Sequence, residues 1–187
     1  MIGLCVRMPA DEIVLPITEP ETEWVRGRPL QKVSPKRNHA RVQAKLSSAL
    51  DAWSRGRGEV GTEWRFRIAV PGEPRRPLVP DIAFVAFERL RGLGVDDIQT
   101  PAFAPTVAIE VLSPGDDPRD VASKVDVFLR GGTELVIIVD PASRTMTLHD
   151  RVSSRICSPA ATVRHDALPH FELALGPFFA DALDLPT

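Results

Sequence analysis

Two carboxylates stand alone within apolar segments of the sequence. Asp81 is the one charged residue in LVPDIAFVAF at 78–87, and Glu110 is the one charged residue in PTVAIEVLS at 105–113. Short runs rich in Val, Ile and Phe are typical of strands covered on both faces, where an unpaired carboxylate has a large desolvation cost. Either both carboxylates lie at strand ends in water, or a cation and a nearby base hold them. If the two strands are neighbours, the pair forms a hard oxygen site suited to Mg²⁺.

Lys124 borders the apolar stripe of a predicted helix that follows Glu110. The stripe consists of Val121, Val125, Phe128 and Leu129. Because Lys124 stands three residues after the first of these and four before Phe128, its amine can reach toward the sheet and the carboxylates. Helix geometry alone equally allows a lysine whose stem covers apolar surface while its amine stays in water.

His39 lies in the first turn of another predicted helix, three residues before Val42 on its apolar face. A core or capping histidine is the commoner explanation for such a position, and a polar site beneath the helix N-terminus is the more specific one. Zinc is disfavoured, because no metal-ligand spacing relates the four histidines His39, His149, His165 and His170.

The net charge of the chain is small but unevenly distributed. The sequence has 23 Lys and Arg against 25 Asp and Glu, a net charge of −2, which excludes a uniformly basic coat for nucleic acid. Residues 26–76 nevertheless carry a net charge of +9 and leave −11 for the remainder. Either a basic face that meets a polyanion or a dipolar surface that aids solubility gives this asymmetry. The candidate phosphate contacts, each of which has a solvated surface charge as its alternative, are Lys36, Arg37, Arg41, Lys45, Arg65 and Arg67.

The order of the predicted elements defines the fold class. Helices are expected from Ser34-Pro35 to Gly56 and from Asp117 to Gly131-Gly132, where capping residues and an apolar period of 3.6 coincide. Alternation of helices with strands predicts an α/β fold with an α+β mixed sheet, in which helices flank a central mixed β-sheet. The length of 187 residues predicts an N-terminal arm at 1–22 and a single domain at 23–187. The expected strands lie at 23–33 (two, around a turn), 59–70, 78–87, 105–113, 134–141 and 146–158 (a hairpin), followed by a poorly patterned C-terminus.

Other motifs narrow the function classes. The segment GRGEVG at 56–61 matches GxGxxG, but a helix before it and a strand after it reverse the order that a dinucleotide site needs, so a glycine-rich turn is favoured. The sequence has no GxxxxGK[ST], GxSxG or HExxH motif. Cys5 and Cys157 form no CxxC pair, and no secretory or membrane-spanning run is present, which predicts a cytoplasmic protein without a membrane partner.

Five features together resemble the bacterial Uma-type restriction endonuclease family, part of the PD-(D/E)XK nuclease superfamily. The resemblance extends over about residues 22–180 and implies a restriction-endonuclease-like core. Its specificity comes from the ordered set rather than from any one motif. The matching features are VSPKRNHARVQAKL at 33–46, LVPDIAFV at 78–85, AIEVLSPGDD at 108–117, Lys124, and GGTELVIIVDP at 131–141.

The resemblance implies a role for each candidate residue. Asp81 and Glu110 would bind the metal, and Lys124 would be the catalytic lysine. The Glu-x-Lys motif of the superfamily would place a lysine where this chain has Leu112, so the resemblance implies that the lysine has moved to the following helix. His39 matches a histidine at the start of the family's first core helix and is included among the catalytic candidates.

The implied activity is hydrolysis of phosphodiester bonds in double-stranded DNA. Mg²⁺ would be the cofactor, with Mn²⁺ as a substitute, and Lys124 would orient the water or stabilise the transition state. Glu63, expected on the polar face of the strand at 59–70, is a weaker site candidate. Cutting both strands favours a homodimer. The alternatives are a catalytically silent nuclease-fold protein that binds DNA or acts as a scaffold, and a hydrolase of another phosphoester.

Overall fold

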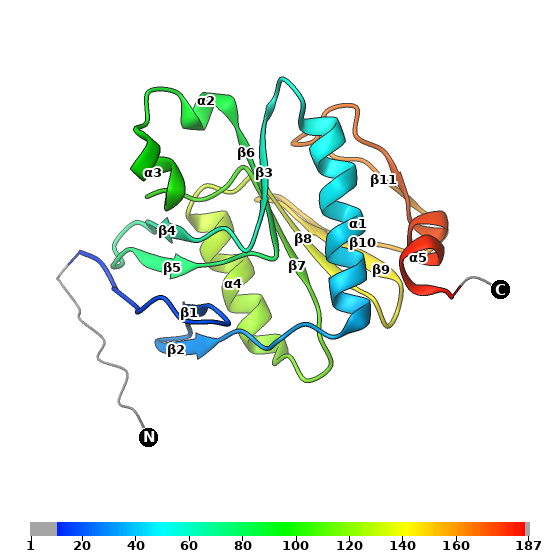
Figure 1. Cartoon of the computed structure of the whole chain (residues 1–187), viewed down its shortest axis with the longest axis horizontal. Coiled ribbons are helices and arrows are strands. Elements are labelled where there is room, and N and C mark those ends of the chain that lie inside the picture. The colour runs from blue at the N-terminus through cyan, green and yellow to red at the C-terminus, as the bar shows by residue number, and fades with distance from the viewer. Residues whose placement is uncertain (1–10, 186–187) are drawn as a thin grey trace.

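The computed structural model describes residues 11–185, and within them six strands form a central mixed sheet (Figure 1). The order across the sheet is β10-β9-β8-β7-β6-β3. β7 and β8 run parallel, and the other neighbouring strands of this sheet run antiparallel. The predicted mixed sheet is therefore confirmed. Its strands are β3 (Gly58–Thr62), β6 (Ile82–Ala86), β7 (Val107–Val111), β8 (Leu135–Asp140), β9 (Thr145–His149) and β10 (Ser154–Cys157).

Helices cover both faces of this sheet, as Figure 1 shows for α1 and α4. Successive side chains of a strand point to opposite faces. Ile82 and Ile109 accordingly pack into the core formed with α1 and α5, whereas Ala83 and Ala108 pack into the core formed with α4. The three helices are α1 (Arg37–Ser54), α4 (Pro118–Arg130) and α5 (Leu175–Leu183).

Helix α4 is the crossover that connects the parallel strands β7 and β8, and it begins where the sequence predicts. The side chain of the N-cap residue Asp117 accepts a hydrogen bond of 2.9 Å from the backbone N–H of Arg119. Pro118 occupies the first helical position, where no intrahelical donor is lost. The helix ends at Gly131, and it places Lys124 over the sheet.

Short elements surround this core. β1 and β2 form the predicted hairpin, whose turn residues Arg26 and Gly27 have φ angles of 50° and 73°. The hairpin packs against β5 and α4. In the described part of the chain the remaining elements are β1 (Thr22–Val25), β2 (Arg28–Gln31), β4 (Phe66–Ile68), β5 (Arg76–Leu78), α2 (Phe87–Leu90), α3 (Val95–Gln99), β11 (Thr162–Val163) and β12 (Leu173–Ala174).

The single strand predicted at 59–70 is two strands in two different sheets. β3 ends at Thr62, the backbone of Glu63 turns with a φ of 51°, and the chain resumes as β4, which pairs with β5. Glu63 therefore stands at a bend and not on the polar face of a strand. The period of two nevertheless identified residues that are fully buried in the structure, namely Phe66 and Ile68.

The C-terminus, expected to be poorly patterned, contains helix α5. Gly176 and Pro177 resemble helix breakers in the sequence, but both lie in the first turn of α5, where proline is tolerated. Phe179 and Ala182 are fully buried against the core that includes α1. Tertiary packing of the apolar face therefore stabilises a helix that the local sequence predicts only weakly.

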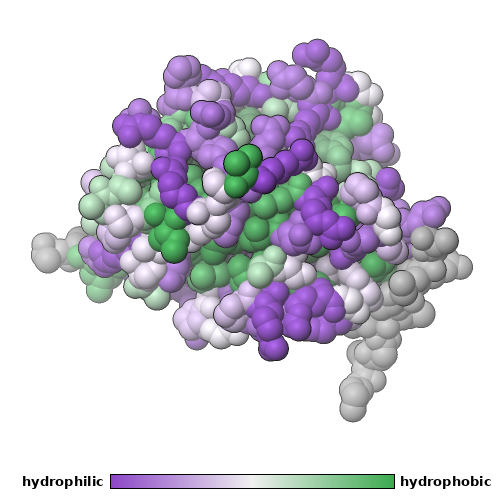
Figure 2. All heavy atoms as spheres, turned by 180° about the vertical axis from the view of Figure 1, so that it is seen from behind, coloured by the Kyte–Doolittle hydropathy of each residue, from purple (hydrophilic) through white to green (hydrophobic). Residues whose placement is uncertain are grey.

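The segment before β1 packs onto the domain from residue 11 onward. Ile13 and Leu15 are buried, and Glu12 forms an isolated bridge with Arg75. The first ten residues of the predicted arm lie outside the described residues. On the face shown in Figure 2, polar and apolar side chains are interspersed. In residues 11–185, no helix has both the length and the apolar character that crossing a membrane requires.

The glycine-rich segment 56–61 is a turn only at its start, because residues 58–61 belong to strand β3. The close packing of Gly58 in this strand generates a stability prediction. A Cβ on Gly58 would lie 2.2 Å from the carbonyl oxygen of Val85 in the neighbouring strand. We expect Gly58→Ala to lower the free energy of unfolding by about 3 kcal/mol, because backbone must move to relieve the overlap. Urea denaturation measures this loss.

Gly94→Ala is the matched control for this substitution. A Cβ on Gly94 would meet its nearest neighbour atom at 3.6 Å, which is ordinary contact. We expect this variant to lose less than about 1 kcal/mol. Equal stabilities of the two variants would contradict the packing account of Gly58.

Candidate active site

Asp81 and Glu110 lie opposite each other at the ends of two neighbouring strands. Antiparallel pairing of Ile82 with Ile109 fixes the register of β6 and β7. Asp81 immediately precedes Ile82, and Glu110 immediately follows Ile109, so the same register brings the two carboxylates together. Both residues are buried, with exposed fractions of 2% and 7%. The alternative in which both lie in water at strand ends is wrong.

The Asp81 carboxylate is held on both of its oxygens. Oδ1 accepts a hydrogen bond of 2.6 Å from Lys32 Nζ, and Oδ2 accepts one of 2.7 Å from the backbone N–H of Val111. Oδ2 also lies 3.1 Å from Nε2 of His39. Burial disfavours the charged form, but the hydrogen bond from His39 and the charge of Lys32 outweigh it, so the pKa of Asp81 lies below its usual range.

Glu110 is in a different electrostatic environment. Its Oε2 accepts a hydrogen bond of 2.6 Å from Lys124 Nζ, while its Oε1 is buried and has no hydrogen-bond partner among the described residues. Burial is the largest influence and raises the pKa of Glu110; Lys124 opposes this, and the negative charges of Asp81 and Glu23 add to it. The unpaired buried oxygen is a position where a cation would be favourable.

Lys124 reaches under α4 to a pair of buried carboxylates, so the side chain does not snorkel into water. Its amine is 2.6 Å from Oε2 of Glu110 and 2.9 Å from Oε2 of Glu23. Glu23, in β1, is 1% exposed, and its Oε1 accepts a hydrogen bond of 2.7 Å from the backbone N–H of Val79. Burial disfavours the charged amine of Lys124, but the two carboxylates outweigh it and raise its pKa.

Lys32, which follows β2, is a second cation in the site. Its amine donates to Asp81 Oδ1 at 2.6 Å, to Glu63 Oε2 at 2.8 Å and to the carbonyl oxygen of Val79 at 3.0 Å. Gln43 of α1 holds the other oxygen of Glu63 at 3.0 Å. Burial alone would lower the pKa of Lys32, but the surrounding carboxylates raise it above its ordinary value.

The β1–β2 hairpin carries Glu23 and leads directly into Lys32, and ion pairs fasten it to α4. Arg28 contacts the carboxylate of Asp120 at 2.7 Å, and Arg26 contacts it at 3.2 Å. Asp120 is itself buried in the first turn of α4. These contacts fix the hairpin beside the helix that carries Lys124.

Sequence reasoning missed Glu23 and Lys32. Both stand in short segments rich in charge, where a solvated face is the default expectation. The one sequence signal for Glu23 is its position in a short predicted strand, between Thr22 and Trp24 and two residues before the apolar Val25. Nothing in the local sequence distinguishes Lys32 from its basic neighbours.

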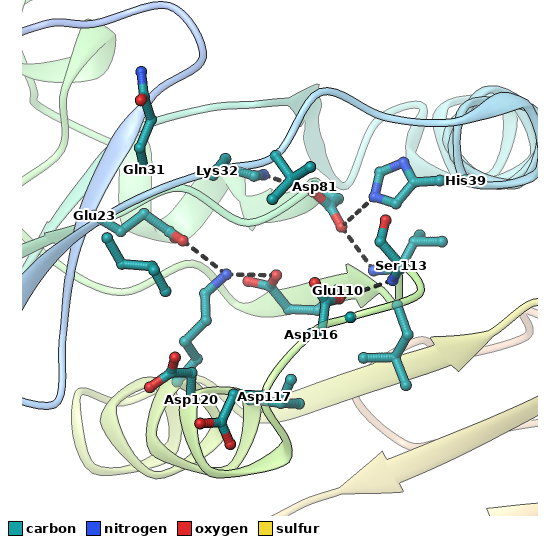
Figure 3. A pocket seen from close by; sticks show the side chains of 17 residues that line it. Glu23, Gln31, Lys32, His39, Asp81, Glu110, Ser113, Asp116, Asp117 and Asp120 are labelled. Atoms are coloured by element: carbon teal, nitrogen blue, oxygen red, sulfur yellow. Dashed lines mark hydrogen bonds and ion pairs between the residues drawn. The ribbon is translucent and has the colours of Figure 1, made fainter.

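A cavity of about 210 Å³ opens onto these groups, and Figure 3 shows Glu23, Lys32, His39, Asp81 and Glu110 converging on it. Three further carboxylates that line it come from the loop after β7 and from the start of α4. These are Asp116, Asp117 and Asp120. The site is thus enclosed between the ends of β6 and β7, the hairpin, and the N-terminal parts of α1 and α4.

The donor set fits a hard divalent cation in part. Among residues 11–185, no group of three or more His, Cys, Asp or Glu side chains is arranged to hold a metal ion. Mg²⁺ in proteins needs only one or two carboxylates, because water and substrate phosphate complete its coordination. Glu110 Oε1 and the adjacent Asp81 carboxylate meet that smaller requirement.

None of the six predicted phosphate contacts is among the residues that line this cavity. Lys36 is exposed just before α1. Arg37, Arg41 and Lys45 make contacts with the C-terminal part of α5, including an ion pair of 2.7 Å between Lys45 and Asp181. Arg65 pairs with Glu21, and Arg67 with Glu12. Contact of these residues with DNA stays a prediction.

The fold belongs to the restriction-endonuclease-like class predicted from the sequence, and comparison with known proteins identifies the family. A family model described as "Putative restriction endonuclease" (Uma2) matches residues 12–176. The chain therefore belongs to the Uma2 family.

A solved structure has a similar fold. It is the crystal structure of "a putative nuclease belonging to DUF820 from Anabaena variabilis ATCC 29413", which is 24% identical and has a TM-score of 0.80. The similarity covers 90% of this chain and 95% of the Anabaena chain. A search of the curated proteins gives no match.

The buried Lys124 ion pairs predict a strong dependence of stability on this amine. We expect Lys124→Met to lower the free energy of unfolding by roughly 3–5 kcal/mol, because Glu23 and Glu110 stay buried without their cation. Adding Glu110→Gln should restore part of the loss, since one of the two unpaired charges is then removed. Urea denaturation of the wild type, both single variants and the double variant gives the coupling energy.

Arg119→Met on the same helix is the control, because its side chain is 75% exposed and its ion pair should contribute at most about 1 kcal/mol. Strictly additive effects of Lys124→Met and Glu110→Gln would contradict the pairing described here.

Proposed function

We propose that this protein is a Mg²⁺-dependent endonuclease that hydrolyses phosphodiester bonds in double-stranded DNA, with Mn²⁺ as a substitute cofactor. The observation that carries the proposal is the convergence of Asp81, Glu110 and Lys124 at one cavity. Membership of a family described as "Putative restriction endonuclease" and the fold shared with the Anabaena structure described as "a putative nuclease" support a nuclease. Cleavage of both strands often uses two copies of such a site, which favours a homodimer.

In this proposal Asp81 and Glu110 hold the metal ion. The pair fits because Glu110 Oε1 is buried and unpaired among the described residues and lies beside a carboxylate whose low pKa keeps it ionised. When bound, Mg²⁺ lowers the pKa of a coordinated water and offsets negative charge that develops on the phosphate.

The chain's own residues orient the carboxylates and supply positive charge. Lys124 fixes the position of Glu110 through its 2.6 Å contact, and its ammonium group favours the negatively charged transition state. Among residues 11–185, His39 forms a side-chain hydrogen bond with Asp81 alone, so in this proposal it acts through Asp81 as a positioning residue. The backbone N–H of Val111 serves the same purpose.

Plasmid cleavage tests this proposal. Purified protein should nick or linearise supercoiled plasmid with Mg²⁺ or Mn²⁺ and should be inactive in excess chelator. Asp81→Ala and Glu110→Ala should each lower the cleavage rate by at least about 100-fold, because each removes a metal ligand. Asp126→Asn, which changes an exposed carboxylate on α4, should leave the rate unchanged. Full activity of either alanine variant would contradict the assignment.

A nuclease-fold protein that binds DNA without cutting it is the second candidate. This candidate is favoured because Asp81 and Glu110 each form an ion pair with a lysine amine, and these ion pairs stabilise the site without a metal. This candidate predicts salt-dependent DNA binding without cleavage, unaffected by Lys124→Ala. Metal-dependent cleavage that is lost in Lys124→Ala would exclude it.

A further inference from the structure

Oxygen atoms surround the Lys32 amine as ligands would surround a bound metal ion. Its amine has three hydrogens and meets three oxygens at 2.6, 2.8 and 3.0 Å, from Asp81, Glu63 and the carbonyl of Val79. Two carboxylates and a backbone carbonyl are the oxygen ligands that hard divalent cations use. The amine is also held deep in the site, since the side chain is only 13% exposed.

From this geometry we infer that the Lys32 ammonium permanently occupies the place of a second metal ion, so that the active site binds a single divalent cation, between Asp81 and Glu110. The inference rests on the proposed function, because it takes the metal to be held by these two carboxylates. It adds the number of ions and the residue that limits that number. Many phosphodiester-cleaving sites use two metal ions. In this protein the Lys32 ammonium group would replace one of those two ions.

The hydrogen-bonding capacity of Asp81 supports a single remaining position. A carboxylate offers about four lone-pair directions. Asp81 already uses three of them, for Lys32, His39 and the backbone N–H of Val111. One direction on Asp81 is therefore left, together with the unpaired Oε1 of Glu110, and these two positions would be available to one ion.

The cluster around Lys32 contains more carboxylates than amines. Four carboxylates, from Glu23, Glu63, Asp81 and Glu110, surround the amines of Lys32 and Lys124. A bound cation would offset this excess of acidic groups. Removing the Lys32 amine would make the net charge of the cluster more negative by one unit. It would also free the three oxygen atoms that contact this amine, which we call the oxygen cage.

The number of bound ions can be counted with Mn²⁺ alone, without DNA, by titrating the full chain and following the electron paramagnetic resonance signal of free Mn²⁺. The wild type should bind one ion per chain. Lys32→Met, and Lys32→Gln as a second variant that keeps a polar group, should bind two. The two ions should show the altered spectrum of neighbouring, spin-coupled Mn²⁺. Thermal unfolding identifies which variant is folded.

Two controls isolate the role of the amine. Glu63→Gln removes a carboxylate of the cage and leaves Lys32 in place, so the count should stay at one. Arg91→Met removes an exposed positive charge outside the site and should also leave one ion.

Each remaining outcome counts against the inference. Two ions in the wild type would overturn it, and this count needs no variant. One ion in the wild type and one in a folded Lys32 variant would overturn it while leaving the proposed nuclease function intact. No bound Mn²⁺ in any variant would overturn both the inference and the metal dependence of the proposed function.

Discussion

The pairing of β6 with β7 is the constraint on which the site depends. The register that joins Ile82 to Ile109 buries Asp81 and Glu110 side by side. Two neighbouring carboxylates with little access to water are strongly unfavourable unless positive charge and hydrogen bonds compensate them. The surrounding structure supplies that compensation, and most of the polar groups near the ends of these strands serve it.

The compensation comes from elements that are far apart in the sequence. Lys124 approaches from the crossover helix α4, His39 from the first turn of α1, and Lys32 from the chain that leaves the N-terminal hairpin. Docking of the hairpin through Asp120 therefore affects the chemistry of the site as well as the packing. Hydrogen bonds and ion pairs hold these groups in fixed positions, which is what the proposed electrostatic stabilisation of a transition state requires.

The central elements and the main candidates were predictable because strong local signals identify them. A lone acid in each of two apolar strands indicated Asp81 and Glu110, and the stripe edge of α4 indicated Lys124. Glu23 and Lys32 were not predictable, because their burial arises from docking of a small charged hairpin and not from their neighbours in sequence. The bend at Glu63 was missed for a related reason. Apolar residues continue to alternate through the bend, although β3 before it pairs with β6 and β4 after it pairs with β5.

The charge asymmetry of the sequence also has a structural explanation. Many of the basic side chains at 26–76 are paired within the protein, as Arg28 is with Asp120 and Lys45 with Asp181. A net charge of +9 for this segment therefore does not translate directly into a basic surface. Part of it neutralises acids elsewhere in the domain, including those of the site.

We propose that Asp81 and Glu110 form one divalent-metal position beside a fixed Lys32 amine. A crystal structure of the protein soaked in Mn²⁺, with anomalous scattering used to locate the ion, tests it most directly. We expect one anomalous peak within coordination distance of both carboxylates, with the Lys32 amine still bound to Asp81, Glu63 and the carbonyl of Val79. A peak in the Lys32 position, or no peak between Asp81 and Glu110, would contradict it.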